Sequence, residues 1–335
     1  MDKHTALKQY FGHMTFRPGQ EEGIDALLSG RDVLGVMPTG AGKSMCYQIP
    51  AILLDGITMV VSPLISLMKD QVASLSQAGV PASFLNSSLS KAQRQEVMRR
   101  AEQGRYKMIY VAPERLEAPD FLRFASHIRI SLLAVDEAHC VSQWGQDFRP
   151  SYLKIPDFIE GLPHRPAVGA FTATATSAVK EDIVRMLHLR HPLVLTTGFD
   201  RPNLYFDVKA PKNKMAFLLD YLGRNAEKSG IIYCATRKGV ELVCHTLRQN
   251  GISVTRYHAG LDPEERQKNQ EDFACDRKHV MAATNAFGMG INKSNVGFVL
   301  HYNMPKDLES YYQEAGRAGR DGEPADCILL FSFGD

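Results

Sequence analysis

The sequence predicts an α/β fold of two domains, each a mostly parallel sheet flanked by helices. The length of 335 residues exceeds the core of one ordinary domain of about 150 residues. Short runs rich in β-branched residues alternate with helical patterns in both halves, which is typical of parallel sheets covered by helices. Turn-forming residues at 198–203 separate the halves.

In the first half, five short apolar runs have the length and composition of buried strands. These runs are residues 32–37, 58–61, 108–111, 132–135 and 168–172. Helical patterns separate them: one begins with a capping residue at Ser90 and continues to Gly104, and another covers 177–189 with apolar residues at helical spacing.

The second half shows the same order of elements without matching the first half residue by residue. Its predicted strands are residues 231–234, 254–257, 280–283, 298–302 and 327–331. We place the seam between Thr196 and Lys209, and the two domains at 1–198 and 199–335.

The composition is typical of a globular protein, with 44% hydrophobic and 23% charged residues. The longest apolar runs, such as 49–54 and 328–331, are far shorter than the roughly 20 residues of a membrane span. Residues 1–4 lack the pattern of a signal peptide, so we expect a cytoplasmic protein with no membrane partner.

Neither the cysteines nor the net charge identify a partner. The six cysteines are scattered without a C-x-x-C pair, which predicts reduced thiols and no zinc site in this chain. A net charge of +2 is too small to indicate a nucleic-acid binder by itself. The partner must therefore be inferred from local motifs, and we expect a monomeric core.

Residues 37–44, Met-Pro-Thr-Gly-Ala-Gly-Lys-Ser, follow a predicted strand and open a helical run. Backbone N–H groups at such a turn surround phosphates, a lysine adds charge, and a serine hydroxyl binds Mg²⁺. The sequence therefore predicts an ATP site with Mg²⁺ on Ser44. A strand-to-helix turn without a ligand is the alternative, but it leaves Lys43 and Ser44 unexplained. The predicted nucleotide-binding residues are Thr39, Gly40, Ala41, Gly42, Lys43 and Ser44.

An apolar run ends in the acidic pair Asp136-Glu137, so both carboxylates should emerge at the carboxyl edge of a sheet, where α/β proteins bind ligands. We assign Asp136 to Mg²⁺, which prefers hard oxygen ligands, and Glu137 to the attacking water. A solvated acidic turn is the alternative, and the phosphate-binding loop argues against it.

Residues 311–322 place Arg317 and Arg320 three positions apart, which predicts one face of a helix. Phosphoryl transfer gains from positive charge on the γ-phosphate, and an arginine supplied by another domain couples hydrolysis to domain closure. The alternative is a solvated basic turn.

In this order, the motifs resemble those of superfamily-two helicases, and of the RecQ family in particular. The resemblance covers almost the whole chain and rests on six segments: 16–20, 136–139, 143–150, 172–176, 287–293 and 313–320. It implies two RecA-like domains, ATP as cofactor, and 3′ to 5′ movement along single-stranded DNA with unwinding of partly duplex DNA in repair and recombination.

Residue roles follow from the same resemblance. Arg17 and Gln20 would read adenine, and His13 would stack on it where the family often has tyrosine. Arg320 would act as the arginine finger. The remaining carried-over residues are Gln313 and Arg317, which would contact phosphate or the hydrolytic water, and His139 and Thr174, which would relay nucleotide state to the DNA groove.

The aromatic-rich loop at 143–150 predicts a DNA contact through Gln143, Trp144, Phe148 and Arg149. Single strands are held by phosphate contacts and by base stacking worth about 1–3 kcal/mol per base. Packing of Trp144 and Phe148 in the core between the two domains is the alternative. Two strand ends supply further DNA-binding candidates, each with a plain loop as its alternative: Ser62, Lys69 and Arg115.

The sequence departs from the family pattern at three places. Gln146 stands where histidine is common, and His13 replaces tyrosine. The sequence also stops at Asp335, without the cysteine-rich zinc module and winged helix that usually follow in the family. The chain is thus expected to be a fragment or a short enzyme. Two other functions remain open: an ATP-regulated clamp or annealing factor, and an RNA helicase.

Overall fold

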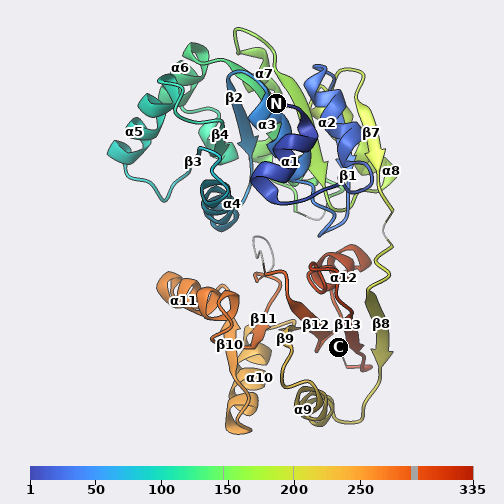
Figure 1. Ribbon diagram of the computed structural model, residues 1–335. Coiled ribbons are helices and arrows are strands. Elements are labelled where there is room, and N and C mark those ends of the chain that lie inside the picture. The colour runs from blue at the N-terminus through green and yellow to red at the C-terminus, as the bar shows by residue number, and fades with distance from the viewer. Residues whose placement is uncertain (146, 199, 288–292, 335) are drawn as a thin grey trace. The chain divides into compact units, whose positions relative to one another are not determined.

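The computed structural model describes residues 1–145, 147–198, 200–287 and 293–334 (Figure 1). The chain divides into two compact units, Met1–Phe199 and Asp200–Asp335. Each unit holds one parallel sheet flanked by helices, which confirms the predicted α/β class.

The first unit begins with two helices and then alternates strands with helices. In chain order the elements are α1 Lys3–Phe11, α2 Gln20–Leu28, β1 Val33–Val36, α3 Met45–Leu53, β2 Ile57–Val61, α4 Ile65–Gln77, β3 Ala82–Leu85, α5 Lys91–Glu102, β4 Met108–Val111, η1 Pro113–Arg115, α6 Pro119–His127, β5 Ile130–Val135, η2 Ala138–Val141, η3 Pro150–Lys154, α7 Ile155–Glu160, β6 Ala167–Thr172, α8 Ser177–Met186 and β7 Leu193–Thr196.

The seven strands of this sheet lie in the order β3-β4-β2-β5-β6-β1-β7, and every described pairing is parallel. All carboxyl ends therefore meet at one edge, where open α/β sheets bind ligands. Because β6 lies between β1 and β5, the segments that follow β1 and β5 flank the end of β6.

Helices cover both faces of the first sheet (Figure 1). Helices α5 to α8 bury their apolar residues against one face, and α2 to α4 bury theirs against the other. Helix α1 packs on α2 and α3 through Leu7 and Ile24, which are fully buried. Burial on both faces explains the continuous apolar runs of the central strands.

Two strands of this unit, β3 and β7, are not predicted by the sequence pattern. Both lie at the edges of the sheet, and their residues are largely half-buried or exposed. Edge strands therefore lack the continuous apolar run that marks a central strand. The predicted cap at Ser90 is confirmed, since Ser90 and Gln93 form a capping box at the start of α5.

The second unit follows the same order of alternating elements. They are β8 Leu204–Lys209, α9 Lys214–Arg224, β9 Ser229–Tyr233, α10 Arg237–Gln249, β10 Val254–Tyr257, α11 Pro263–Ala274, β11 Val280–Ala283, β12 Val296–His301, α12 Leu308–Ala315 and β13 Ala325–Leu330. The sheet order is β10-β11-β9-β12-β13-β8, again with parallel pairings. Helices α9 and α10 cover one face, and α11 and α12 the other.

The predicted seam between Thr196 and Lys209 is too long, because β8 is a strand of the second sheet and not a connection. It pairs with β13 along its whole length. Tyr205 and Val208 are 61% and 62% exposed, so this edge strand has no buried apolar face that the sequence pattern would reveal.

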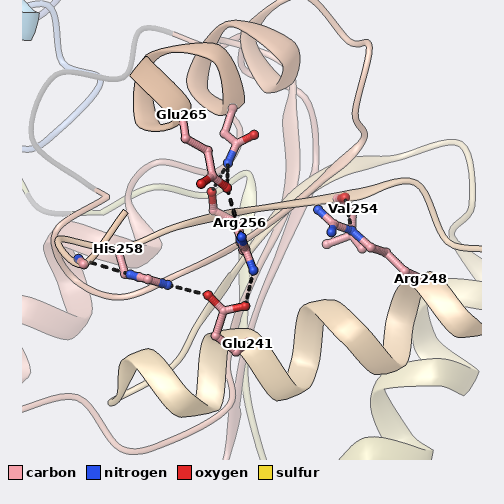
Figure 2. A network of polar contacts seen from close by, with 8 residues as sticks. Glu241, Arg248, Val254, Arg256, His258 and Glu265 are labelled. Atoms are coloured by element: carbon pink, nitrogen blue, oxygen red, sulfur yellow. Dashed lines mark hydrogen bonds and ion pairs between the residues drawn. The ribbon is translucent and has the colours of Figure 1, made fainter. Parts of the chain in front are cut away.

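A network of ion pairs and hydrogen bonds joins β10, at the other edge of the second sheet, to helices α10 and α11 (Figure 2). Arg256 of β10 forms ion pairs with Glu241 of α10 and with Glu265 of α11. His258 Nε2 lies 2.7 Å from Glu241 Oε1, and its Nδ1 accepts from the Gly260 N–H at 3.2 Å. Although burial opposes it, hydrogen bonds from His258 and Arg256 hold the pKa of Glu241 below its ordinary value.

Within the described part of the chain, no helix combines the length and apolarity that crossing a membrane requires.

Candidate functional site

The phosphate-binding loop connects β1 to α3. Gly40 and Gly42 have φ values of 86° and 80°, a conformation that glycine adopts without steric cost. A Cβ atom on Gly42 would lie 2.4 Å from Gln20 Nε2. Lys43 Nζ donates to the Met37 carbonyl at 3.1 Å, so the lysine side chain folds back along the loop.

Two residues assigned to adenine recognition contact this loop directly. Gln20, at the start of α2, donates from Nε2 to the carbonyls of Ala41 at 3.1 Å and Gly42 at 3.0 Å. Arg17 donates to the Gly40 carbonyl, and its N–H donates to Gln20 Oε1 at 2.8 Å. His13 is exposed in the segment between α1 and α2. The structure thus places Arg17 and Gln20 in contact with the phosphate loop.

The acidic pair follows β5, as predicted. The Asp136 N–H donates to the Val61 carbonyl at 2.9 Å, and the Tyr152 hydroxyl donates to the Asp136 carbonyl at 2.9 Å. Glu137 adopts a left-handed conformation with φ 48° and ψ 47°. For a residue other than glycine, this left-handed conformation raises the free energy of the folded state by about 1–2 kcal/mol, and such strain is often found at functional sites.

The two neighbouring carboxylates of Asp136 and Glu137 repel each other, and a bound cation would relieve this repulsion. Burial and, to a smaller extent, the charge of Glu137 raise the pKa of Asp136 to about 7, although Lys43 opposes the rise. Lys43 therefore lies near enough to interact with Asp136. A buried carboxylate and the Ser44 hydroxyl are hard oxygen donors of the kind that Mg²⁺ takes together with phosphate oxygens. No group of three or more His, Cys, Asp or Glu side chains gathers as a metal cage among the described residues.

The buried His139 links the acidic turn to the end of β6. Its Nδ1 lies 2.9 Å from Thr172 Oγ1 and 3.4 Å from Glu137 Oε2. The Thr172 hydroxyl also lies 3.0 Å from the Thr174 carbonyl, and when it donates its proton there, His139 Nδ1 is the donor to Thr172 Oγ1. The side chain beside His139 is thus that of Thr172, while Thr174, the residue named from the family pattern, contributes its backbone carbonyl.

Asp136→Asn should stabilise the protein without ligands. The pKa of Asp136 is raised in the folded state, so the folded state holds a proton that the unfolded state loses near pH 4. Stability is therefore lost as pH rises from about 4 through neutrality, and the neutral amide avoids this loss. We expect thermal or urea unfolding to show a gain of up to about 4 kcal/mol at pH 8 that disappears at pH 4. The exposed Asp55→Asn serves as control, and a gain independent of pH would contradict the argument.

The aromatic-rich loop follows η2, directly after the acidic turn. Trp144 is 81% exposed and Gln143 is exposed, whereas Phe148 and Arg149 are half-buried. Arg149 pairs with Asp147 at 2.7 Å and donates to the Pro63 carbonyl at 3.1 Å. The exposed Trp144 therefore does not pack in the core of the first unit.

The other DNA-binding candidates of the first unit lie at the same edge of the sheet. Ser62 is fully buried at the end of β2, and its hydroxyl has no hydrogen-bond partner among the described residues. Lys69 is exposed on α4. Arg115 in η1 pairs with Asp120 at 2.9 Å, so this contact competes with any phosphate for its guanidinium.

In the second unit, Gln313 lies on α12, but the predicted helix face for the two arginines is wrong. Helix α12 ends at Ala315, and Arg317 and Arg320 lie in the turn that follows. Glycine is a poor helix former, and Gly316 follows α12 directly. Gly319, within the turn, has a φ of 55°, which is outside helical geometry.

The two arginines sit in a strongly positive environment. Arg317 is 6% exposed, and its Nε has no hydrogen-bond partner among the described residues. Burial, together with the charges of Arg317 and Arg201, lowers the pKa of Arg320 to about 9. An anion near this turn would relieve the repulsion, which is the electrostatic property that a phosphate-binding arginine requires.

Sequence reasoning missed the residues that hold this turn. The Gly319 carbonyl accepts from Arg201 Nη2 at 2.6 Å and from Asn203 Nδ2 at 2.8 Å, and Asn203 also donates to the Glu323 carbonyl at 2.9 Å. In the sequence, Arg201 and Asn203 belong to the predicted seam. Their polar side chains among turn residues were the one available signal.

Gln146 and most of the 287–293 motif, residues 288–292, lie outside the described residues. The described end of that motif, Lys293, is buried and pairs with Asp276 at 2.6 Å.

Comparisons with known proteins agree with the motif order. The family model for DEAD/DEAH box helicases matches residues 17–182, and that for the helicase conserved C-terminal domain matches residues 213–322. The yeast Saccharomyces cerevisiae protein Dbp5, solved with RNA and ADP BeF3, superimposes with a TM-score of 0.77 at 20% identity, over 99% of this chain and 87% of that one. This likeness concerns the fold alone and confirms the pair of RecA-like domains.

Closer relatives share the sequence itself. The chain is 49% identical to the ATP-dependent DNA helicase RecQ of Bacillus subtilis, over 97% of this chain and 55% of the relative. It is 47% identical to the RecQ helicase of Pasteurella multocida, over 99% of this chain and 53% of the relative. It spans about half the length of these relatives. With both helicase family models matched in order and nearly half of its residues identical to these proteins, the chain belongs to the RecQ family of helicases.

Proposed function

We propose that this chain is the motor core of an ATP-dependent DNA helicase. It couples Mg-ATP hydrolysis to 3′ to 5′ translocation on single-stranded DNA and to unwinding of partly duplex DNA in repair and recombination. It works as a monomeric core in the cytoplasm and needs no zinc within these residues. Light scattering of the purified chain tests the monomer, which a dimer mass would contradict.

In this proposal, the phosphate loop binds the triphosphate through its backbone and Lys43. Ser44 and Asp136 hold Mg²⁺, which supplies charge neutralisation at the phosphates when bound. Glu137 orients or deprotonates the attacking water. Its Oε2 is buried without a hydrogen-bond partner among the described residues, as suits an acceptor that a water would satisfy.

The remaining nucleotide contacts are also proposals. Arg17 and Gln20 hydrogen-bond adenine while they hold the loop, and His13 stacks on the base. Gln313 and Arg317 contact phosphate or the water, and Arg320 stabilises charge on the transferred phosphoryl group. The lowered pKa of Arg320 supports this role, because a bound phosphate would stabilise the charged guanidinium.

One observation carries the DNA part of the proposal: Trp144 is exposed on a loop that begins immediately after η2, the short helix bearing His139. A base stacked on Trp144 is thereby connected to Glu137 through a few bonded residues. Ser62, Lys69, Arg115, Gln143, Phe148 and Arg149 complete the proposed DNA surface.

Two measurements test the function. Phosphate release should rise when single-stranded DNA is added, and a duplex with a 3′ tail should be unwound while a 5′-tailed duplex is not. Stimulation without strand displacement would favour an ATP-regulated clamp or annealing factor. Stronger stimulation by RNA than by DNA in a competition assay would favour an RNA helicase.

Trp144→Ala should lower the DNA-stimulated rate of ATP hydrolysis about tenfold, since loss of one stacked base costs about 1–3 kcal/mol. Trp144→Phe, which keeps an aromatic face, is the matched control and should retain most of the stimulation. Equal stimulation in Trp144→Ala and wild type would exclude Trp144 from the DNA contact.

A further inference from the structure

The base of the aromatic-rich loop contains a buried polar contact that no motif describes. Ser142, the first residue after η2, is fully buried, and its hydroxyl donates to Asp182 Oδ2 at 2.7 Å. Asp182 lies on α8 and is 9% exposed. A buried carboxylate and hydroxyl in this geometry form a charge-assisted hydrogen bond, which is stronger than a bond between neutral groups.

The same hydroxyl orients the loop. The Trp144 N–H donates to Ser142 Oγ at 3.1 Å, and the Gly145 N–H donates to the Ser142 carbonyl at 3.0 Å. A hydroxyl that gives its proton to Asp182 keeps its oxygen lone pairs as acceptors, and the Trp144 N–H donates to one of them. Asp182 therefore sets the direction of the bond that holds the backbone of Trp144.

Close packing leaves this part of the loop little freedom. A Cβ atom on Gly145 would lie 2.3 Å from the His139 carbonyl oxygen. The other end of the loop is tied as well, because the Arg149 N–H donates to the Cys140 carbonyl at 2.9 Å. The exposed indole of Trp144 thus projects from a backbone that is fixed on both sides.

Asp182 also connects this loop to the nucleotide-facing edge. Helix α8 is capped by Thr176 and directly follows the Thr172–Thr174 segment that contacts His139. It packs against η2, which carries His139. One short helix therefore joins the end of β6 to the base of the loop.

We propose that Asp182 is a positioning residue that holds Trp144 in a DNA-responsive geometry through the hydroxyl of Ser142. The inference rests on the proposed DNA-stimulated hydrolysis and assigns to Asp182 the transmission step. Asp182 contacts neither substrate nor reacting atoms in this role. Its removal uncouples DNA binding from hydrolysis, while hydrolysis without DNA continues.

The test uses the whole chain and four variants: Asp182→Ala, Ser142→Ala, the double variant, and Asp182→Asn. Asp182→Ala should reduce DNA stimulation about tenfold while the KM for ATP and the rate without DNA stay unchanged. The double variant should lose no more than either single variant, because both changes break one contact. Asp182→Asn keeps an acceptor oxygen and should restore much of the stimulation. Arg185→Ala, which removes the 75%-exposed ion-pair partner of Asp182, is the matched control.

Trp144 is the only tryptophan, so its fluorescence reports on this loop alone. Without DNA, Asp182→Ala and Ser142→Ala should lower the anisotropy of Trp144, and Asp182→Asn should not. Unchanged anisotropy in both alanine variants, or a rate without DNA that falls in proportion to the stimulated rate, would overturn the proposal. Absence of DNA stimulation in the wild type would instead refute the proposed function, since the anisotropy measurement needs no DNA.

Discussion

Arg320→Ala is expected to lower ATP turnover about 10³-fold or more while the Kd for ATP changes little. Arg320 lies in a turn of the second unit, whereas the phosphate loop with Lys43 belongs to the first. ATP affinity should therefore depend on Lys43, and the hydrolysis step on Arg320. Lys43→Ala is expected to lose both binding and turnover. Equilibrium titration with a fluorescent ATP analogue and single-turnover hydrolysis separate the two effects.

Folding is not expected to obscure this result. Burial and the charge of Arg317 lower the pKa of Arg320, so removal of its charge relieves repulsion within the turn. The melting temperatures of Arg320→Ala and wild type are compared to confirm that the variant is folded. Arg320→Lys keeps the charge without the planar fork and should recover only part of the turnover. Equal loss of ATP affinity in Arg320→Ala and Lys43→Ala would refute the division of roles.

Glu137→Gln should lower hydrolysis about 10²–10⁴-fold, because the amide cannot accept the proton of the attacking water. The side chain keeps its size and its position near His139, so nucleotide affinity should be preserved. Single-turnover phosphate release measures the effect. Glu160→Gln, which removes an exposed carboxylate on α7, is the matched control, and a loss of less than tenfold in Glu137→Gln would contradict the role.

Glu137→Gly separates chemistry from backbone conformation. The left-handed φ of 48° at Glu137 costs glycine nothing, so this variant should melt at a higher temperature and still fail to hydrolyse ATP. Full activity of Glu137→Gly would show that the turn matters and the carboxylate does not. Loss of both stability and activity would show that the carboxylate holds the turn.

Local sequence patterns predicted the parts of this protein that depend on near neighbours. The central strands β2, β4 and β5 are apolar on both faces, because helices cover the sheet on both sides. The phosphate loop required glycines at Gly40 and Gly42, and the structure shows positive φ at both. These structural requirements involve only a few consecutive residues, so they can be predicted from the sequence without knowledge of distant contacts.

Contacts between distant segments needed the tertiary structure. The strand β8 was missed because its partner is β13, more than a hundred residues away, and its side chains remain exposed. Thr172 and Thr174 have the same side chain two positions apart, so the sequence had no basis for choosing which hydroxyl faces His139. The turn that carries Arg317 and Arg320 is held by Arg201 and Asn203.

The sequence by itself determined the residue types of the chemistry: a phosphate loop, an acidic pair, an aromatic loop and an arginine pair, in an order that identifies the family. Only the tertiary structure decided which groups touch, as in the bond from Ser142 to Asp182, 40 residues along the chain. The reason is physical. Hydrogen-bond partners are selected by the direction of side chains on packed elements, and that direction exists only once the sheet and its helices have assembled.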